Sequence, residues 1–279
     1  MGAIGDWLGK GSSKLTWIDA DRYVWSVFAG RPDCWYEDPA GLAGASTRAQ
    51  ALLRSDVQEV RVAGPFSGLL READGPDGVA EAFAAGEGRR LLGETLDALA
   101  YQLDPAVDLA LVCPSPWDLL QGGQRDDFFA LDDVAAAMLE MLRGLADRRV
   151  AALVIARTQA GPPGDDELES WSTMLSAAAH YGWRTAARLE GVEPVPGGEL
   201  PTDLVLLPGA GPEQLGEDSR IGGGLVPAFW DAGEAADLIA ERAVARAFRF
   251  GEIPTGVAPE SVLFRLDQLA GGEAGNIER

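Results

Sequence analysis

The segment from Asp108 to Pro116 reads DLALVCPSP, and it decides the fold class. Its first six residues form a nearly continuous apolar run, which is typical of a parallel strand covered by helices on both faces of its sheet. Pro114 and Pro116 end this strand, because proline cannot donate a backbone hydrogen bond. A strand of this kind needs parallel neighbours, and the flanking sequence supplies them.

Short β-type runs alternate with amphipathic helical stretches on both sides of this segment. The pattern predicts a loop over residues 74–78 and another over 194–198. Alternation of strand and helix gives parallel strands joined by right-handed crossovers. We expect strands at 15–18, 57–62, 108–113, 150–156, 183–189, 203–207 and 224–230, and helices at 20–28, 88–103, 131–147, 165–182 and 232–248.

Two folds are built in this way, a closed (β/α)8 barrel and an open doubly wound sheet. The length of 279 residues is close to the roughly 250 that are typical of the barrel. No Gly-rich dinucleotide fingerprint opens a helix, which argues against the open sheet. We therefore predict an α/β fold, a single-domain (β/α)8 TIM barrel. Residues 1–56 would hold an N-terminal segment with the first strand and helix, residues 57–270 the remainder of the barrel, and residues 271–279 a frayed tail.

The charge balance limits the partners. The chain has 23 Lys and Arg residues against 44 Asp and Glu residues, a formal net charge of −21. Such a surface repels nucleic-acid backbones and anionic membranes. No apolar run is long enough to span a membrane, and no secretory apolar run opens the chain. We expect a cytoplasmic protein that binds a small-molecule ligand and does not bind nucleic acid or membranes. The sequence leaves open whether the protein forms a homo-oligomer or a complex with a partner protein.

Few residues are available for metal or covalent cofactor chemistry. The single histidine, His180, and two distant cysteines, Cys34 and Cys113, do not make an ordinary four-ligand zinc site. The only lysines, Lys10 and Lys14, lie in an N-terminal segment expected to be mobile, which argues against Schiff-base chemistry. We therefore expect no metal and no cofactor.

Asp19 and Asp21 follow the first expected strand. Two carboxylates in this position are able to hold Mg²⁺ in a phosphatase of the haloacid dehalogenase kind. That mechanism also uses a downstream lysine, and the chain has none after Lys14. The favoured interpretation is that both are acids at a helix N-terminus, where the helix dipole stabilises negative charge.

Polar residues that follow expected strands define a predicted site, because a barrel builds its active site at the carboxyl ends of its strands. We expect Arg157 to bind an anionic group and Asp118 or Asp231 to move a proton, so these three are the predicted catalytic residues. An Arg157 paired with a nearby acid is an equal alternative, since charged residues also line the polar rim of any barrel. The predicted substrate-binding residues are Gly64, Pro65, Ser115, Trp117, Glu190 and Trp230.

Three segments, in this order, resemble the superfamily of cobalamin-independent methionine synthase and uroporphyrinogen decarboxylase. VRVAGPFSGLL (residues 60–70) resembles a strand and Gly-Pro turn of the synthase's C-terminal barrel, and DLALVCPSP resembles its next unit. GGGLVPAFWDAGEAADLIAERAVARAF (residues 222–248) resembles the strand, polar turn and helix near the end of that barrel. The resemblance covers about residues 57–270 and implies a TIM barrel.

The chain departs from this superfamily at the metal site. Ala156, Arg157 and Thr158 stand where the synthase's zinc-binding His and Cys follow a strand, and Thr255 stands where its last zinc Cys precedes a glycine. Only Arg22 and Arg31 are candidates for the decarboxylase's N-terminal arginines.

Two functions follow from this resemblance. One is a metal-free enzyme that acts on a small or planar organic substrate by methyl or group transfer or by decarboxylation. The alternative is a non-catalytic barrel relative that serves as a partner or regulatory subunit. A part-apolar cavity with converging polar groups would favour the enzyme, whereas a filled barrel mouth and a large exposed apolar patch would favour the subunit.

Overall fold

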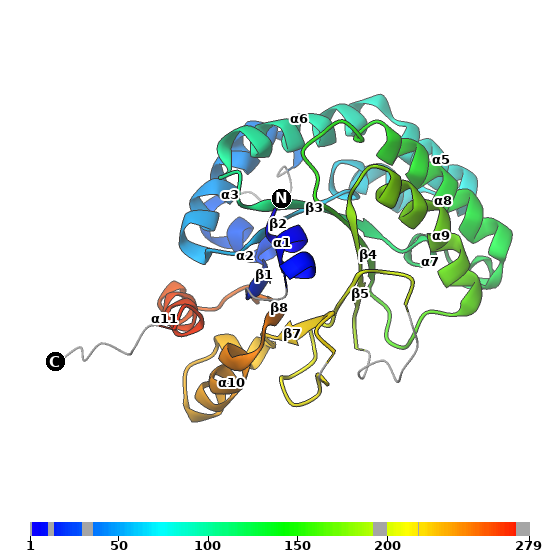
Figure 1. The fold of residues 1–279 in the computed structure, drawn as a ribbon. Coiled ribbons are helices and arrows are strands. Elements are labelled where there is room, and N and C mark those ends of the chain that lie inside the picture. Colours follow the sequence, from blue (N-terminus) through cyan, green and yellow to red (C-terminus); the bar gives the residue numbers. More distant parts are fainter. Residues whose placement is uncertain (1, 11–13, 30–35, 192–199, 217, 272–279) are drawn as a thin grey trace.

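The structure is a computed structural model, and it describes residues 2–10, 14–29, 36–191, 200–216 and 218–271. Eight parallel strands form a nearly closed barrel in the order β1-β8-β7-β6-β5-β4-β3-β2 (Figure 1). The predicted single-domain TIM barrel is confirmed. The strands are β1 (Leu15–Asp19), β2 (Val57–Arg61), β3 (Asp108–Pro114), β4 (Ala152–Arg157), β5 (Arg184–Leu189), β6 (Leu204–Leu206), β7 (Ile221–Gly224) and β8 (Phe248–Glu252).

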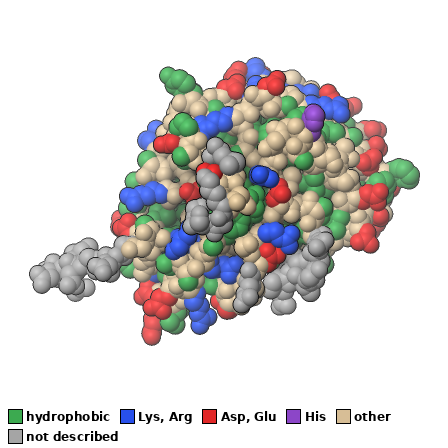
Figure 2. All heavy atoms as spheres, in the orientation of Figure 1, with side chains coloured by type: hydrophobic (Ala, Val, Ile, Leu, Met, Phe, Trp, Pro, Cys, Tyr) green, Lys and Arg blue, Asp and Glu red, His purple; other side chains and the backbone are tan. Residues whose placement is uncertain are grey.

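Helices surround the strands, and α1 lies across the barrel (Figure 1). Asp and Glu side chains gather along the edge over α5, α8 and α9 (Figure 2). A π-helical turn (Trp25–Ala29) and 3-10 turns at Gly64–Phe66, Gly122–Asp126 and Pro227–Trp230 complete the described helical segments. The helices are α1 (Ala3–Lys10), α2 (Asp21–Val24), α3 (Pro39–Leu53), α4 (Ser67–Glu72), α5 (Gly75–Ala84), α6 (Gly86–Gln102), α7 (Pro116–Leu119), α8 (Phe128–Arg143), α9 (Asp165–His180), α10 (Glu234–Ala245) and α11 (Pro259–Leu269).

Strand alternation divides the apolar side chains into two cores. On β4, Leu153 and Ile155 belong to the core between the strands and the surrounding helices, whereas Val154 belongs to the core inside the barrel. Successive side chains of a strand point to opposite faces, so a single strand such as β4 contributes to both cores. The inner core consists of Ile4, Trp7, Leu15, Trp17, Val57, Ala110, Val112, Ala152, Val154, Ala186, Leu204, Leu206, Phe248 and Phe250.

The first helix, α1, closes the amino end of the barrel. Ile4 and Trp7 are buried, and the Trp7 ring lies 5.2 Å from that of Phe248. The backbone N–H of Ile4 donates to Asp108 at the start of β3, over 2.8 Å. The prediction of a mobile N-terminal segment is therefore wrong for residues 3–10. Small inner residues on β3, β4 and β5 leave room at this end, and the apolar face of α1 fills it.

Three other predictions are corrected, two of them in the carboxyl-terminal third of the barrel. The strand predicted at 224–230 lies earlier, at β7, and residues 227–230 form a 3-10 turn. The helix predicted at 232–248 ends at Ala245, and β8 follows it. The loop predicted at 74–78 instead begins α5 at Gly75. In β7 a Cβ on Gly222 would lie 2.6 Å from the Phe248 ring, so packing requires glycine where the apolar pattern gives no strand signal.

No strand ladder pairs β1 with β2 in the described residues, and a backbone hydrogen bond and several side chains join them instead. The Thr16 N–H donates to the Asp56 carboxylate over 2.7 Å, and the Asp56 N–H donates to the Thr16 carbonyl over 2.8 Å. The Ser55 hydroxyl accepts from the Ile18 N–H. These contacts join the amino-terminal halves of β1 and β2 and so close the barrel there. Other side chains join the carboxyl-terminal halves of the two strands.

Some expectations concern residues outside the described ranges: Arg31, Cys34, the loop at 194–198 and the tail from residue 272. Within those ranges no helix is both long and apolar enough to cross a membrane. The predicted cytoplasmic location stays a prediction.

Replacing Trp7 with alanine tests the sealing role of α1. Because the Trp7 side chain is buried in the inner core, we expect Trp7→Ala to lower the free energy of unfolding by about 3–5 kcal/mol. Urea denaturation followed by circular dichroism measures this loss. The control Tyr101→Ala removes a ring that is 91% exposed, and it should change stability by less than about 0.5 kcal/mol. Equal effects of the two substitutions would contradict the sealing role.

Candidate functional site at the carboxyl ends of the strands

Charged side chains occupy the carboxyl end of the barrel, directly above its apolar interior. Asp19 follows Trp17 on β1 by two positions, Arg188 follows Ala186 on β5, and Glu252 follows Phe250 on β8. Glu59 and Arg61 continue the inward face of β2 beyond Val57. Because inward positions recur every second residue, these five side chains point into the barrel and form one layer. The hydrophobic inner core lies directly beneath this layer.

Asp19 is the centre of this layer. Its Oδ2 accepts hydrogen bonds from Arg61 Nη2, over 2.7 Å, and from Arg188 Nη1. Its Oδ1 accepts from the backbone N–H of Asp21. Burial alone would raise the pKa of Asp19, but the two guanidinium groups lower it to about 2. Asp19 is therefore a permanent anion that holds two arginines in place.

Arg188 connects Asp19 to three further carboxylates. Its Nη2 lies 3.2 Å from Glu252 and its Nε lies 3.3 Å from Glu190. Its Nη1 lies 3.6 Å from Glu59. The predicted substrate-binding residue Glu190 is thus at the outer edge of the network, with its side chain 36% exposed.

Glu59 is a buried carboxyl with one oxygen that accepts no hydrogen bond. Its Oε1 accepts from the indole N–H of Trp17 over 2.9 Å, while its Oε2 makes no hydrogen bond. Burial, reinforced by the negative charge of Asp19, raises the pKa of Glu59 to about 7 against the opposing effect of Arg188. Glu59 is therefore placed to gain or lose a proton near neutral pH.

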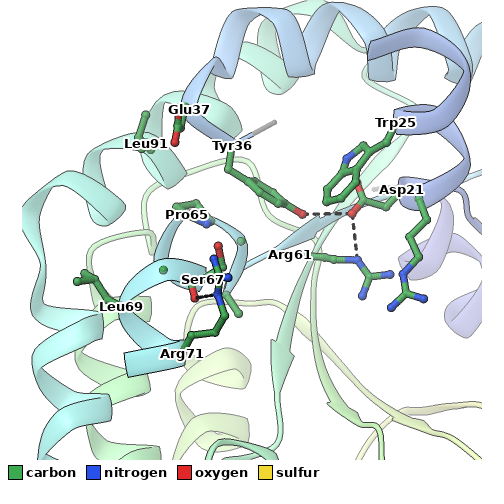
Figure 3. Close-up of a pocket in the computed structure, with 14 residues that line it drawn as sticks. Asp21, Trp25, Tyr36, Glu37, Arg61, Pro65, Ser67, Leu69, Arg71 and Leu91 are labelled. Carbon is green, nitrogen blue, oxygen red and sulfur yellow. Dashed lines mark hydrogen bonds and ion pairs between the residues drawn. The ribbon is translucent and has the colours of Figure 1, made fainter. Parts of the chain in front are cut away.

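Asp21 continues the network toward solvent. Its Oδ2 accepts from Arg61 Nε over 3.1 Å and from the Tyr36 hydroxyl over 3.2 Å, and Figure 3 shows the three side chains pointing toward one another. Burial raises the pKa of Asp21 to about 6 despite the nearby Arg61. Burial and the Asp21 charge also raise the pKa of Tyr36, so its phenol stays protonated and donates.

A cavity of about 790 Å³ opens beside Asp21 and Arg61. Gly64 permits this arrangement, because a Cβ there would collide with the Tyr36 ring. In the described part of the chain nothing accepts a hydrogen bond from Arg61 Nη1. The cavity combines guanidinium groups, aromatic rings and apolar side chains; its lining is Asp21, Arg22, Trp25, Tyr36, Glu37, Arg61, Ala63, Gly64, Pro65, Ser67, Gly68, Leu69, Arg71 and Leu91 (Figure 3).

Of the residues predicted from the sequence, Gly64 and Pro65 line this cavity. Arg157 does not: it follows Leu153 and Ile155 on the outward face of β4 and forms a buried ion pair with Glu167, over 3.0 Å. Its Nη1 also donates to two carbonyls of the following loop. Pairing with an acid, the alternative left open by the sequence, is what the structure shows.

Ser115, Trp117 and Asp118 surround the same pair. The Ser115 hydroxyl donates to Glu167 over 2.6 Å, and the Trp117 ring lies 4.7 Å from the guanidinium of Arg157. Asp118 accepts from the backbone N–H of Thr158 over 2.7 Å. These contacts hold the loops after β3 and β4 against α9.

Trp230 and Asp231 belong to a separate cluster. Trp230 is fully buried, Asp231 is exposed, and the Asp231 carbonyl accepts two hydrogen bonds from Arg265. Arg157 and Asp231 therefore contact different partners, and neither lines the cavity. Their roles in binding and proton transfer stay predictions.

The sequence did contain a signal for the residues that were not selected. In VQEVR, the sequence of β2, and in RTAARL, that of β5, charged side chains recur at alternate positions that also include buried apolar residues. The sequence gives no strand prediction at β8, since the predicted helix ends at Phe248, the first residue of that strand, and Glu252 was therefore not among the candidates. Asp19 and Asp21 follow the first predicted strand, where the sequence favours their interpretation as acids at a helix N-terminus.

Comparison with known proteins supports the fold and leaves the reaction open. No protein-family model matches the chain, and no curated protein matches it. The structure is similar to that of a methyltransferase from Methanosarcina mazei, with a TM-score of 0.57, 13% sequence identity and 93% of each chain covered. A DUF72 family protein from Enterococcus faecalis has a TM-score of 0.41 and 13% identity, with 92% of this chain and 95% of that chain covered. At 13% identity the likeness to the methyltransferase shows the fold alone.

Glu59→Gln tests the buried proton site. The pKa of Glu59 is about 7 in the folded protein and ordinarily 4.5, so the folded state binds more protons than the unfolded state between these values. Stability should therefore fall as pH rises through this window. The substituted amide would keep an acceptor for Trp17 and carry no charge. We expect the stability of Glu59→Gln relative to wild type to improve from pH 5 to pH 8, by up to about 3 kcal/mol.

Urea denaturation at several pH values measures this change. Glu140→Gln, which removes an exposed carboxylate on α8, serves as the control and should keep the wild-type profile. A constant difference between Glu59→Gln and wild type across the pH range would show that Glu59 is ionised throughout.

Proposed function

We propose that the protein is a metal-free TIM-barrel enzyme that binds a small, planar, anionic organic molecule in the cavity beside Arg61. It acts on this molecule by methyl or group transfer or by decarboxylation, as the resemblance to the methionine synthase and uroporphyrinogen decarboxylase superfamily implies. The observation that carries the proposal is the convergence of Arg61, Asp21 and Tyr36 on one wall of the cavity (Figure 3).

The charge of the lining favours an anionic ligand. Arg22, Arg61 and Arg71 all face the cavity, against the two acids Asp21 and Glu37. A guanidinium group binds carboxylate or sulfonate oxygens through charge-assisted hydrogen bonds, and Arg61 Nη1 is free of protein acceptors in the described ranges. The ligand's negative group would therefore lie against Arg61, and Arg71 on the same lining would supply a second guanidinium group.

The remaining lining favours a flat apolar body. Trp25 and Tyr36 supply two aromatic rings, 6.0 Å apart and nearly perpendicular, and Leu69 and Leu91 supply aliphatic surface. Ligand sites commonly combine such apolar walls with a few converging polar groups. A planar molecule would stack on these walls while its anionic group binds Arg61.

The site also contains groups suited to proton transfer. Decarboxylation requires a proton for the carbon that loses CO₂, and group transfer requires a proton to move at the accepting atom. A general acid or base is most effective when its pKa is close to the working pH. Burial brings the pKa of Asp21 to about 6, and Asp21 lines the cavity.

One observation supports the non-catalytic alternative. An apolar groove lies between the segment after β1, α3 and α11, and it is lined by Tyr23, Val27, Phe28, Ala49, Leu52, Leu53, Pro259, Val262, Leu263 and Leu266. Exposed apolar surface of this kind is typical of an interaction site. A second copy of the chain or another protein would cover it. The open, polar barrel mouth nevertheless favours the enzyme, because a degenerate subunit has no need of such a cavity.

Arg71→Met tests the anion-binding cavity without disturbing the buried network. Arg71 is exposed on the rim, and its loss should weaken binding of 2-naphthoate and 2-naphthalenesulfonate about tenfold, the cost of one charged hydrogen bond. Isothermal titration calorimetry measures the affinities. Arg90→Met, which removes an exposed arginine on α6 paired with Glu87 and Glu94, is the control and should bind as wild type does.

A wider panel of planar carboxylates, screened by thermal shift, would then identify substrates. Stabilising compounds would be incubated with the protein and followed by mass spectrometry for loss of CO₂ or gain of a methyl group. If no planar anion stabilises the protein, or if Arg71→Met binds them as tightly as wild type, the proposed function is wrong.

A further inference from the structure

Negative charge exceeds positive charge in the layer behind the cavity. Five carboxylates, those of Asp19, Asp21, Glu59, Glu190 and Glu252, surround the guanidinium groups of Arg61 and Arg188. A third guanidinium, that of Arg22, is mostly exposed and lies 3.9 Å from Glu252. Before any ligand arrives, Arg61 already holds two anions, with Asp19 on Nη2 and Asp21 on Nε.

An anionic ligand at Arg61 Nη1 would place a third negative charge on the same guanidinium. Like charges a few ångströms apart disfavour the ionised form of each other. One of the three anions must therefore take up a proton or leave. Asp19 stays ionised, because two guanidinium groups and a backbone N–H bind it. Asp21 has one guanidinium and one phenol, and it lines the cavity.

The geometry of Asp21 allows protonation without loss of contacts. Both of its side-chain hydrogen bonds, from Arg61 and from Tyr36, are accepted by Oδ2. No described residue hydrogen-bonds Oδ1, which can carry a proton while Oδ2 keeps its two donors. A protonated carboxyl has one O–H to donate, so Asp21 would then be a hydrogen-bond donor at the wall of the cavity.

We propose, on the basis of the function proposed above, that Asp21 takes up one proton from solvent when an anionic ligand binds at Arg61. The resulting carboxylic acid donates a hydrogen bond to the ligand and is the proton donor of the reaction. When Asp21 gives this proton to the substrate, its carboxylate and the ion pair with Arg61 are restored. Ligand binding thus protonates Asp21, and the reaction then uses this proton.

The groups that face Asp21 support this assignment. They are Asp19 of β1, Arg61 of β2, Tyr36 before α3, and Arg22 and Glu37 on the cavity wall; Glu59 lies behind Asp19. Burial already brings the pKa of Asp21 to about 6, so a small added negative potential protonates it at neutral pH. Glu59, with a pKa of about 7, is the competing site for the proton, but it does not line the cavity.

Isothermal titration calorimetry with 2-naphthalenesulfonate tests the proposal, because this probe is planar and stays ionised throughout the useful pH range. Titrations at about pH 7.5 in two cationic buffers of different ionisation enthalpy, Tris and triethanolamine, give the number of protons taken up. We expect a value approaching one for wild type. We also expect the dissociation constant to rise by up to about tenfold per pH unit above about pH 6, as linkage to a single proton requires.

Two conservative variants assign the proton to its residue. Asp21→Asn keeps an oxygen that accepts from Arg61, and it should bind the sulfonate with no proton uptake and no pH dependence. Glu59→Gln should retain the uptake seen in wild type. Arg71→Met should bind more weakly but with unchanged uptake, because Arg71 has no contact with Asp21 in the described residues.

The possible results separate the two proposals. Binding by wild type without proton uptake, or uptake that persists in Asp21→Asn, would overturn the role of Asp21 and leave the anion-binding cavity intact. Loss of uptake in Glu59→Gln alone would move the proton to Glu59 and equally overturn it. If wild type does not bind the sulfonate at all, the proposed function fails, and the role of Asp21 fails with it.

Discussion

The contact between Asp19 and Arg61 is the interaction on which the structure of the carboxyl end of the barrel depends. No ladder joins β1 to β2, and the amino half of their junction is closed by Ser55 and Asp56. At the carboxyl half, Arg61 reaches across from β2 to Asp19 on β1. Each member also has a second partner, Arg188 for Asp19 and Asp21 for Arg61, so this contact is part of a larger network of ion pairs. The same contact therefore completes the ring and fixes the guanidinium that faces the cavity.

The apolar interior beneath this layer strengthens its electrostatics. Trp17, Ala186 and Phe250 fill the barrel directly below the charged side chains, and α1 seals the opposite end. Charges in such a poorly polarisable setting interact more strongly than they do in water. This explains why neighbouring carboxyls differ so much: Asp19, with two arginines, has a pKa of about 2, whereas Glu59, with one oxygen that accepts no hydrogen bond, has one of about 7. The surroundings of the two carboxyl groups therefore give them different protonation states near neutral pH.

The fold could be predicted from the sequence wherever strands are apolar. Strands β3 and β4 carry nearly continuous hydrophobic runs, and the predicted positions of these two strands and of β5 agree with the structure to within two residues. The failures lie at β7 and β8. In β7, Gly222 and Gly223 make room for Phe248 and Leu215. β8 carries Arg249, which is buried and whose guanidinium donates to the carbonyls of Val244 and Leu269. Tertiary contacts stabilise both strands, and local sequence does not reveal these contacts.

The site was harder to predict, because the side of a strand on which a residue lies matters as much as its distance from the strand's end. Arg157 and Arg188 both lie near the carboxyl ends of neighbouring strands, yet the first points outward to Glu167 and the second inward to Asp19. The alternation of side chains along each strand decides whether a residue points inward or outward. This direction can be assigned from the sequence only when at least one inward residue of the strand is known. In β5 the inward alanine at position 186 marks Arg188 as inward as well. A charged residue in phase with the inner core is therefore a better indicator of a barrel site than one that simply follows a strand.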